Sequence, residues 1–143
     1  MPSASPDAPV TIRAATAEDF AGIAAIQSAS PEAAQWPPAD YECLVACVGS
    51  ELAGFLIFRK TAVTEFEVLN LAVQPSRRRR GVARRIMQFM LERHRGEVFL
   101  EVRESNQTAR KFYESIGFQE IGRRKDYYPN PVESGIVMKI LSC

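Results

Sequence analysis

The segment Glu65–Met90 constrains the fold most, because its structural period changes midway along it. In Glu65–Val73, residues two apart would share one face of a β-strand. Gln74-Pro75 ends this strand, and a run of four arginines begins two residues later. After Gly81, apolar residues recur at helical spacing: Val82, Ile86, Phe89 and Met90. The segment therefore predicts a strand and an amphipathic helix joined by a basic turn.

The remaining strand and helix patterns predict one domain built on a mixed sheet. At 143 residues the chain fits one domain. Further helices are expected after Thr16, near Pro37-Pro38, and after Ser105 or Asn106, with Gly117 ending the last one. We expect residues 1–9 to be a flexible tail and residues 10–143 to be the domain. The further strands expected are Val10–Ala14, Cys43–Val48, Leu52–Lys60, Val98–Val102, Phe118–Arg124 and Gly135–Leu141.

Charge and cysteine content exclude several classes of function. The formal net charge is +1, so a general attraction to nucleic acid or to an anionic membrane is not expected. The cysteines Cys43, Cys47 and Cys143 form no C-x-x-C pair, which argues against a disulfide framework or a zinc site. The first nine residues lack the basic and apolar regions of a signal peptide. A cytoplasmic protein without a metal is therefore expected.

The basic turn has the composition of an anion site. A helix N-terminus presents N–H groups without intrahelical acceptors and carries a partial positive charge. Gly81 allows the backbone to approach a ligand closely, and small Ala83 keeps the next position open. The nearby arginines add phosphate donors. A pyrophosphate cradle is favoured; the alternatives are an ordinary basic surface turn or a nucleic-acid patch.

Arg78–Ala83 resembles the Q/R-x-x-G-x-G/A signature of the Gcn5-related N-acetyltransferases, with alanine as the second small residue. The resemblance implies an α/β (α+β) fold of one mixed, mostly antiparallel sheet of six to seven strands with about four helices. It also implies that acetyl-CoA is the cosubstrate. The pantetheine arm would pair with the strand Leu71, Ala72 and Val73, and the Val73 amide would meet the oxyanion. The pyrophosphate would lie on Arg78, Arg79, Arg80, Gly81, Val82, Ala83 and Arg84.

Three further segments are similar to the bacterial ribosomal-protein-alanine N-acetyltransferases. They are Leu100–Asn106, Phe112–Phe118 and Arg123–Pro129. This resemblance implies acetylation of a protein N-terminal α-amine, with a ribosomal protein as one candidate acceptor. The sequence leaves open whether the chain is a monomer or a homodimer, and neither a membrane nor nucleic acid is expected as a partner. Asn130–Ile136 departs from the usual acidic-residue-then-alanine pattern of that subfamily. A small-molecule amine or a lysine therefore stays open as acceptor, as does a non-catalytic acyl-CoA-binding sensor.

The resemblance also assigns candidate catalytic residues. Glu101 matches the proton acceptor of the ribosomal-protein subfamily, and Glu67 matches the base of the histone-type members. Tyr113 matches the tyrosine that assists the departing coenzyme A sulfur, and Asn106 matches a contact to the pantetheine. The ordinary alternatives are a salt-bridged strand carboxylate for each glutamate, a core aromatic for Tyr113 and a helix cap for Asn106. Tyr127 and Tyr128, expected in the loop Asp126–Pro129, would border the acceptor.

Overall fold

The computed structural model describes residues 9–29, 41–129 and 131–142. The chain divides into two units, and each is described by itself. Unit 1 comprises Met1–Arg59 and Leu69–Arg93, and unit 2 comprises Lys60–Val68 and His94–Cys143. The helix expected near Pro37-Pro38 and the tail up to residue 8 lie outside the described residues.

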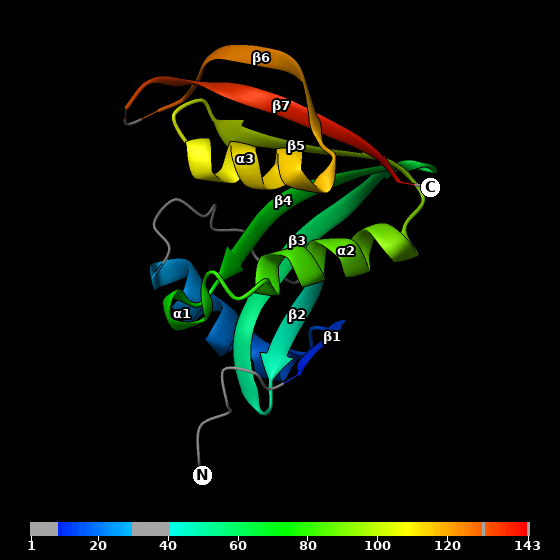
Figure 1. The fold of residues 1–143 in the computed structure, drawn as a ribbon, viewed down its shortest axis with the longest axis vertical. Helices are drawn as coiled ribbons and strands as arrows, with labels where there is room; N and C mark the ends of the chain where they lie inside the picture. Colours follow the sequence, from blue (N-terminus) through cyan, green and yellow to red (C-terminus); the bar gives the residue numbers. More distant parts are fainter. Residues whose placement is uncertain (1–8, 30–40, 130, 143) are drawn as a thin grey trace. The chain divides into compact units, whose positions relative to one another are not determined.

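The predicted mixed sheet is confirmed, with seven strands in the order β1-β2-β3-β4-β5-β7-β6 (Figure 1). The pair β4–β5 is parallel, whereas β1–β2, β2–β3, β5–β7 and β6–β7 are antiparallel. Three α-helices occur in the described part of the chain. None of them is long and apolar enough to cross a membrane. The strands are β1 (Val10–Ala14), β2 (Glu42–Val48), β3 (Glu51–Ala62), β4 (Glu65–Val73), β5 (Gly96–Arg103), β6 (Gln119–Tyr128) and β7 (Glu133–Ser142).

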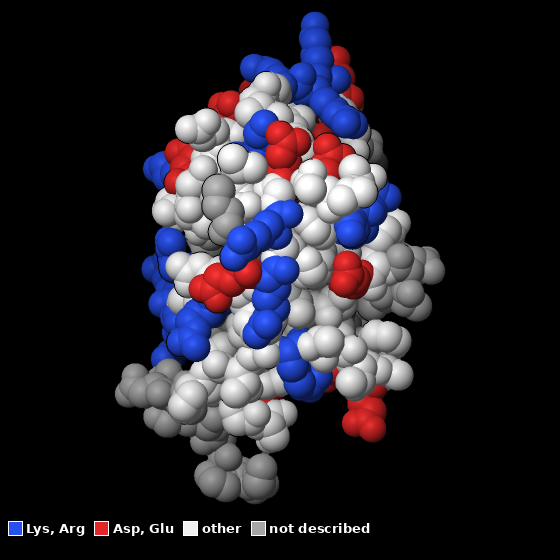
Figure 2. Space-filling view, turned by 90° about the vertical axis from the view of Figure 1, so that its right-hand side faces the viewer, with Lys and Arg blue, Asp and Glu red and all other residues white. Residues whose placement is uncertain are grey.

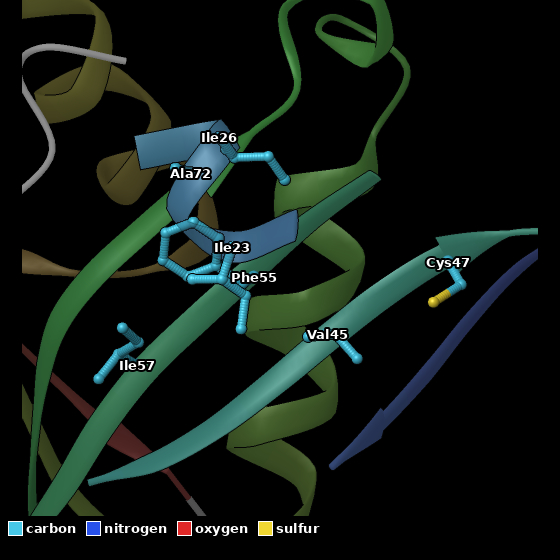
Figure 3. Close-up of a cluster of buried hydrophobic side chains, with 7 residues drawn as sticks. All are labelled: Ile23, Ile26, Val45, Cys47, Phe55, Ile57 and Ala72. Carbon is cyan, nitrogen blue, oxygen red and sulfur yellow. The ribbon is translucent and has the colours of Figure 1, made fainter. Parts of the chain in front are cut away.

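Helix α1 (Phe20–Ala29) provides one side of the core of unit 1. It follows a short 3₁₀ turn, η1 (Ala17–Asp19), as the acidic residues after Thr16 predicted. Its buried side chains pack against β2, β3 and β4, and each contributes about 1.5–3 kcal/mol through burial. Figure 3 shows this cluster, which comprises Ile23, Ile26, Val45, Cys47, Phe55, Ile57 and Ala72.

Strand β4 and the helix after it match the sequence pattern closely. The side chains of β4 alternate between half-buried and buried from Glu65 to Ala72, so Glu67 lies on the less buried face. The amphipathic helix α2 (Val82–Arg93) begins one residue after Gly81. Its buried side chains are Val82, Ile86, Met87 and Met90. The strand, the turn and the helix are therefore present as predicted.

The end of unit 2 differs from the prediction in one respect. Helix α3 (Gln107–Ile116) is followed by Gly117, which has φ +122°, a backbone conformation that favours glycine. Strand β6 then continues through Tyr127 and Tyr128, which were predicted to lie in a loop. Its register with β7 shifts between Arg124 and Tyr128, where Asp126 has φ +53°. Because of this irregularity, β6 includes Tyr127 and Tyr128, although the composition of this segment is typical of a turn.

Candidate active site

The turn after β4 is held at its start by the backbone of unit 1. The Gln74 N–H donates to the Ala53 carbonyl over 2.7 Å, and a 3₁₀ turn, η3 (Pro75–Arg77), follows. Gly54 lies beside this contact. A Cβ on Gly54 would lie 2.8 Å from the Ala72 carbonyl oxygen and 3.3 Å from Val73 Cγ2. The glycine therefore allows β3 to pack closely on the last residues of β4.

The N-terminus of α2 is open to a ligand. The Arg85 N–H donates to the Gly81 carbonyl over 3.0 Å, which closes the first turn of the helix. The amides of Val82 and Ala83 precede this bond, at positions where a helix offers no internal acceptor. Gly81 is exposed with φ +78°, and a Cβ there would meet no atom within 4 Å. These features fit a pyrophosphate held by backbone N–H groups.

The four arginines of the turn have different environments. Arg77 is buried, and its guanidinium pairs with Glu51 over 2.7 Å, so it stabilises the fold of unit 1. Arg78 donates from Nε to the Val73 carbonyl over 3.2 Å and so ties the turn to the end of β4. Arg79, with φ +63°, and Arg80 are exposed. Arg84 is half-buried in the first turn of α2. The exposed arginines are thus the ones placed to supplement the helix amides.

Glu67 and Glu101, both in unit 2, lie on the same face of the sheet. Glu67 is opposite Phe99 in the parallel pair β4–β5, and side chains two residues apart in a strand share a face. Burial is the main cause that raises the pKa of Glu101, and the charge of Glu67 adds to it. The two candidate bases therefore interact electrostatically.

The Glu101 carboxylate combines one ion pair with a buried oxygen. Oε1 lies 3.2 Å from Nε of Arg124. Oε2 is buried and has no hydrogen-bond partner among the described residues. Burial raises the pKa of Glu101; the Arg124 guanidinium opposes this shift and the Glu67 charge adds to it. A carboxylate with a raised pKa is a better match for a general base near neutral pH.

Two tyrosines at the end of β6 lie against the guanidinium groups of two arginines. The Tyr127 and Tyr128 rings meet edge to face, with centroids 5.0 Å apart. The Arg124 guanidinium lies 5.1 Å from the Tyr127 centroid, and that of Arg103 lies 4.7 Å from the Tyr128 centroid. Burial, and next the Glu101 charge, raise the pKa of Tyr128 to about 12. The tyrosines, the two arginines and Glu101 thus form one continuous cluster.

Tyr113 is a buried residue of α3. Its ring makes edge contacts with Phe112 and Phe118, with centroids 5.2 and 5.5 Å away. Burial raises the pKa of its hydroxyl, so the phenol stays protonated and can serve as a hydrogen-bond donor. Asn106 is the N-cap of α3, and its Oδ1 accepts from the Ala109 N–H over 3.1 Å. Tyr113 is therefore a core aromatic and Asn106 is a helix cap, the two ordinary alternatives that the sequence left open for them.

Arg124 and Gly135 were not singled out from the sequence, although Arg124 pairs with Glu101 and a side chain on Gly135 would meet it. A Cβ on Gly135 would lie 2.7 Å from Oε2 of Glu101. Both contacts depend on the register of β5, β6 and β7, which connects residues far apart in the sequence. In residues 9–29, 41–129 and 131–142, no group of three or more His, Cys, Asp or Glu could hold a metal ion.

Residues 12–118 match the acetyltransferase (GNAT) family, and the chain belongs to that family. The N-alpha-acetyltransferase RimI of Mycobacterium tuberculosis is 34% identical over 138 residues, which cover 84% of this chain and 85% of that protein. The [ribosomal protein bS18]-alanine N-acetyltransferase of Haemophilus ducreyi is 34% identical over 57% of this chain and 61% of its own length. An uncharacterised protein of Mycobacterium leprae is 37% identical, but the match spans only 30% of its length.

Solved structures agree with this assignment. The ribosomal-protein-S18-alanine N-acetyltransferase of Escherichia coli superposes with a TM-score of 0.81 at 25% identity, covering 94% of both chains. Ard1 of Thermoplasma volcanium gives a TM-score of 0.83 at 25% identity over 94% of this chain and 98% of its own. The predicted family and its fold are therefore confirmed.

Proposed function

We propose that this chain transfers the acetyl group of acetyl-CoA to the α-amine of a protein N-terminus. The observation that carries the proposal is the Glu101 carboxylate, which is partly desolvated, has a raised pKa and lies beside the Tyr127–Tyr128 cluster. The relatives named for α-amine or alanine N-acetylation support the same reaction.

Each site residue has a role in this proposal. The α2 N-terminus with Gly81, Arg79 and Arg80 binds the pyrophosphate of acetyl-CoA, whose thioester supplies the acetyl group. Leu71–Val73 orients the pantetheine arm, and the Val73 N–H faces the developing oxyanion. Arg78 already occupies the Val73 carbonyl, which fixes the end of the strand.

Proton transfer is assigned to unit 2. Glu101 takes a proton from the attacking amine, directly or through water, and Tyr113 donates a hydrogen bond to the departing sulfur. An α-amine has a pKa of about 7.7–8.0, against about 10.4 for lysine. Much of an α-amine is therefore already neutral near pH 8, and a carboxylate base suffices for it more readily than for lysine.

A panel of acceptors tests the acceptor class. We expect acetyl-CoA turnover with a lysine-free peptide that begins with a free alanine. The same peptide with a blocked N-terminus and one internal lysine is the matched control and should react far more slowly, as should spermidine. Mass spectrometry locates the added acetyl group, while thiol release gives the rate.

Other results of this panel would support one of the alternative functions. Preferred acetylation of lysine or spermidine would contradict the α-amine proposal. Binding of acetyl-CoA without turnover would indicate the sensor. The nucleic-acid alternative predicts binding that weakens steeply with salt. On the face drawn in Figure 2, acidic side chains lie among the basic ones, an arrangement that does not favour this last alternative.

Tyr113→Phe tests the role of the phenol. We expect kcat to fall by about 10- to 10²-fold, the loss of one hydrogen bond to a charged group, which is worth about 1.5–3 kcal/mol. Acetyl-CoA affinity, measured by calorimetry, should be unchanged, because the ring and its contacts with Phe112 and Phe118 are retained. Wild-type turnover in this variant would remove Tyr113 from the mechanism.

A further inference from the structure

Gly135 lies between charged residues on one face of unit 2. In β7 it is opposite Arg103 of β5 and Arg124 of β6. Glu101 is opposite Val137, so it is the diagonal neighbour of Gly135. Opposite and diagonal residues of antiparallel strands carry their side chains on the same face. The glycine therefore leaves a gap between two arginines, next to the glutamate.

The Glu101 carboxylate fills this gap. A Cβ on Gly135 would lie 2.7 Å from Oε2 and 3.1 Å from both Cγ and Cδ of Glu101. The first distance is too short for a real carbon–oxygen contact, so the glutamate would have to move. Glu101 thus lies over the bare backbone of β7, and from this position Oε1 contacts Arg124.

Backbone conformation does not explain the glycine. The glycines with left-handed φ in the described residues are Gly49, Gly81, Gly96 and Gly117, and Gly135 is not among them. Glycine within a strand is otherwise unfavourable, because it loses more conformational entropy and packs no side chain. The space it leaves is therefore the feature that matters at this position.

We propose that Gly135 is a positioning residue: its missing side chain creates the space that holds the Glu101 carboxylate against the sheet and within reach of Arg124. This inference rests on the proposed function, in which Glu101 is the base. It adds a residue of β7, at least 30 positions away in sequence, that determines where the base lies and how far it is buried.

The charged groups around Glu101 fix the expected direction of the effect. On the shared face they are Glu65 and Glu67 of β4, Glu97 and Arg103 of β5, Arg124 and Tyr128 of β6, and Glu133 and Lys139 of β7. Lys139 pairs with Glu97 over 3.1 Å. Arg103 pairs with Glu133 over 3.3 Å and lies on the Tyr128 ring, so Arg124 is the cation that contacts Glu101. Burial is the largest cause of the raised pKa. Pushing the carboxylate outward should therefore lower that pKa.

Gly135→Ala is the test, with Gly122→Ala as its matched control. Gly122 is also a strand glycine opposite Val137, but a Cβ there would meet no atom within 4 Å. We expect Gly135→Ala to lower kcat by about 10- to 10²-fold, since a displacement near 1 Å can have such an effect. The acidic limb of its kcat/KM–pH profile should move to lower pH. Gly122→Ala should match the wild type in both respects.

Two further measurements separate positioning from a general structural effect. In the double variant Glu101→Gln/Gly135→Ala, turnover should be no lower than in Glu101→Gln alone, because the alanine acts only through the carboxylate. Fully additive losses would overturn the inference. The melting temperature of Gly135→Ala should not fall below that of Gly122→Ala by more than a few degrees.

Carbon-13 NMR of the Glu101 carboxyl tests the inference without any turnover. We expect its titration midpoint to be lower in Gly135→Ala than in the wild type and unchanged in Gly122→Ala. Equal midpoints in all three proteins would overturn the positioning role, even if the chain proves to be an active acetyltransferase. A shifted midpoint in a chain that acetylates nothing would instead contradict the proposed function and leave the role of Gly135 intact.

Discussion

Replacement of Glu101 by glutamine is expected to lower kcat/KM for the acceptor amine by about 10²- to 10⁴-fold, the usual contribution of a general base. The amide cannot accept a proton, although it has nearly the same size and can stay in the gap above Gly135. Acetyl-CoA affinity should change little, because the residues assigned to the pyrophosphate belong to the turn after β4 and to α2. Steady-state kinetics with varied acceptor and calorimetry with acetyl-CoA separate the two effects.

Two other glutamate-to-glutamine variants serve as comparisons for Glu101→Gln. Glu97 is on the same strand and face as Glu101, but it pairs with Lys139 over 3.1 Å. Glu97→Gln should retain wild-type kcat/KM. Glu67→Gln tests the competing base: a loss confined to Glu67→Gln would transfer the role to Glu67, and wild-type rates in both variants would remove both glutamates from the mechanism.

The pH dependence follows from the raised pKa of Glu101. The base acts when ionised, so kcat/KM should fall as the pH drops through this pKa, above the ordinary glutamate value. The acidic limb should be absent from the residual activity of Glu101→Gln. For stability, the raised pKa means that ionising Glu101 destabilises the fold. The stabilisation that the fold gains from protonated Glu101 is fully present below the pKa of this group in the unfolded chain. It is lost as the pH rises through the pKa of Glu101 in the folded state.

Local patterns predicted the elements of the fold well. The bounds of β4 and the start of α2 could be taken from Glu65–Val73 and Gly81, because each is marked by residues close in sequence. The end of β6 could not be predicted in this way. Asp126-Tyr127-Tyr128-Pro129 has the composition of a turn, and only pairing with β7, as in Tyr128 opposite Glu133, extends the strand.

The candidate site was predictable where its residues lie close together in the sequence. The turn proposed to bind the pyrophosphate is one continuous segment, and Gly81 within it has a left-handed φ. The arginine run was less informative, because Arg77 is buried and pairs with Glu51, whereas the next three arginines are exposed. The surroundings of Glu101 arise from strand register, so neither Arg124 nor Gly135 carries a local signal in the sequence.

Gly81→Val is expected to weaken acetyl-CoA binding by about 10²- to 10⁴-fold, the loss of about two hydrogen bonds to a charged group. The isopropyl group would enter the space beside the first turn of α2 that a Cβ at this position now finds empty. It would also disfavour φ +78°, the conformation that directs the chain into the helix. Both effects act on the amides of Val82 and Ala83. Calorimetry with acetyl-CoA measures the change.

Gly49→Val separates backbone strain from loss of the anion site. Gly49 has a similar φ of +63°, but it lies in the turn between β2 and β3. A β-branched residue in this region destabilises a fold by about 1–3 kcal/mol, so both variants should unfold at lower temperature than the wild type. Only Gly81→Val should lose affinity for acetyl-CoA. If both variants lose affinity equally, the effect is one of stability. If Gly81→Val binds like the wild type, the pyrophosphate does not lie on the N-terminus of α2.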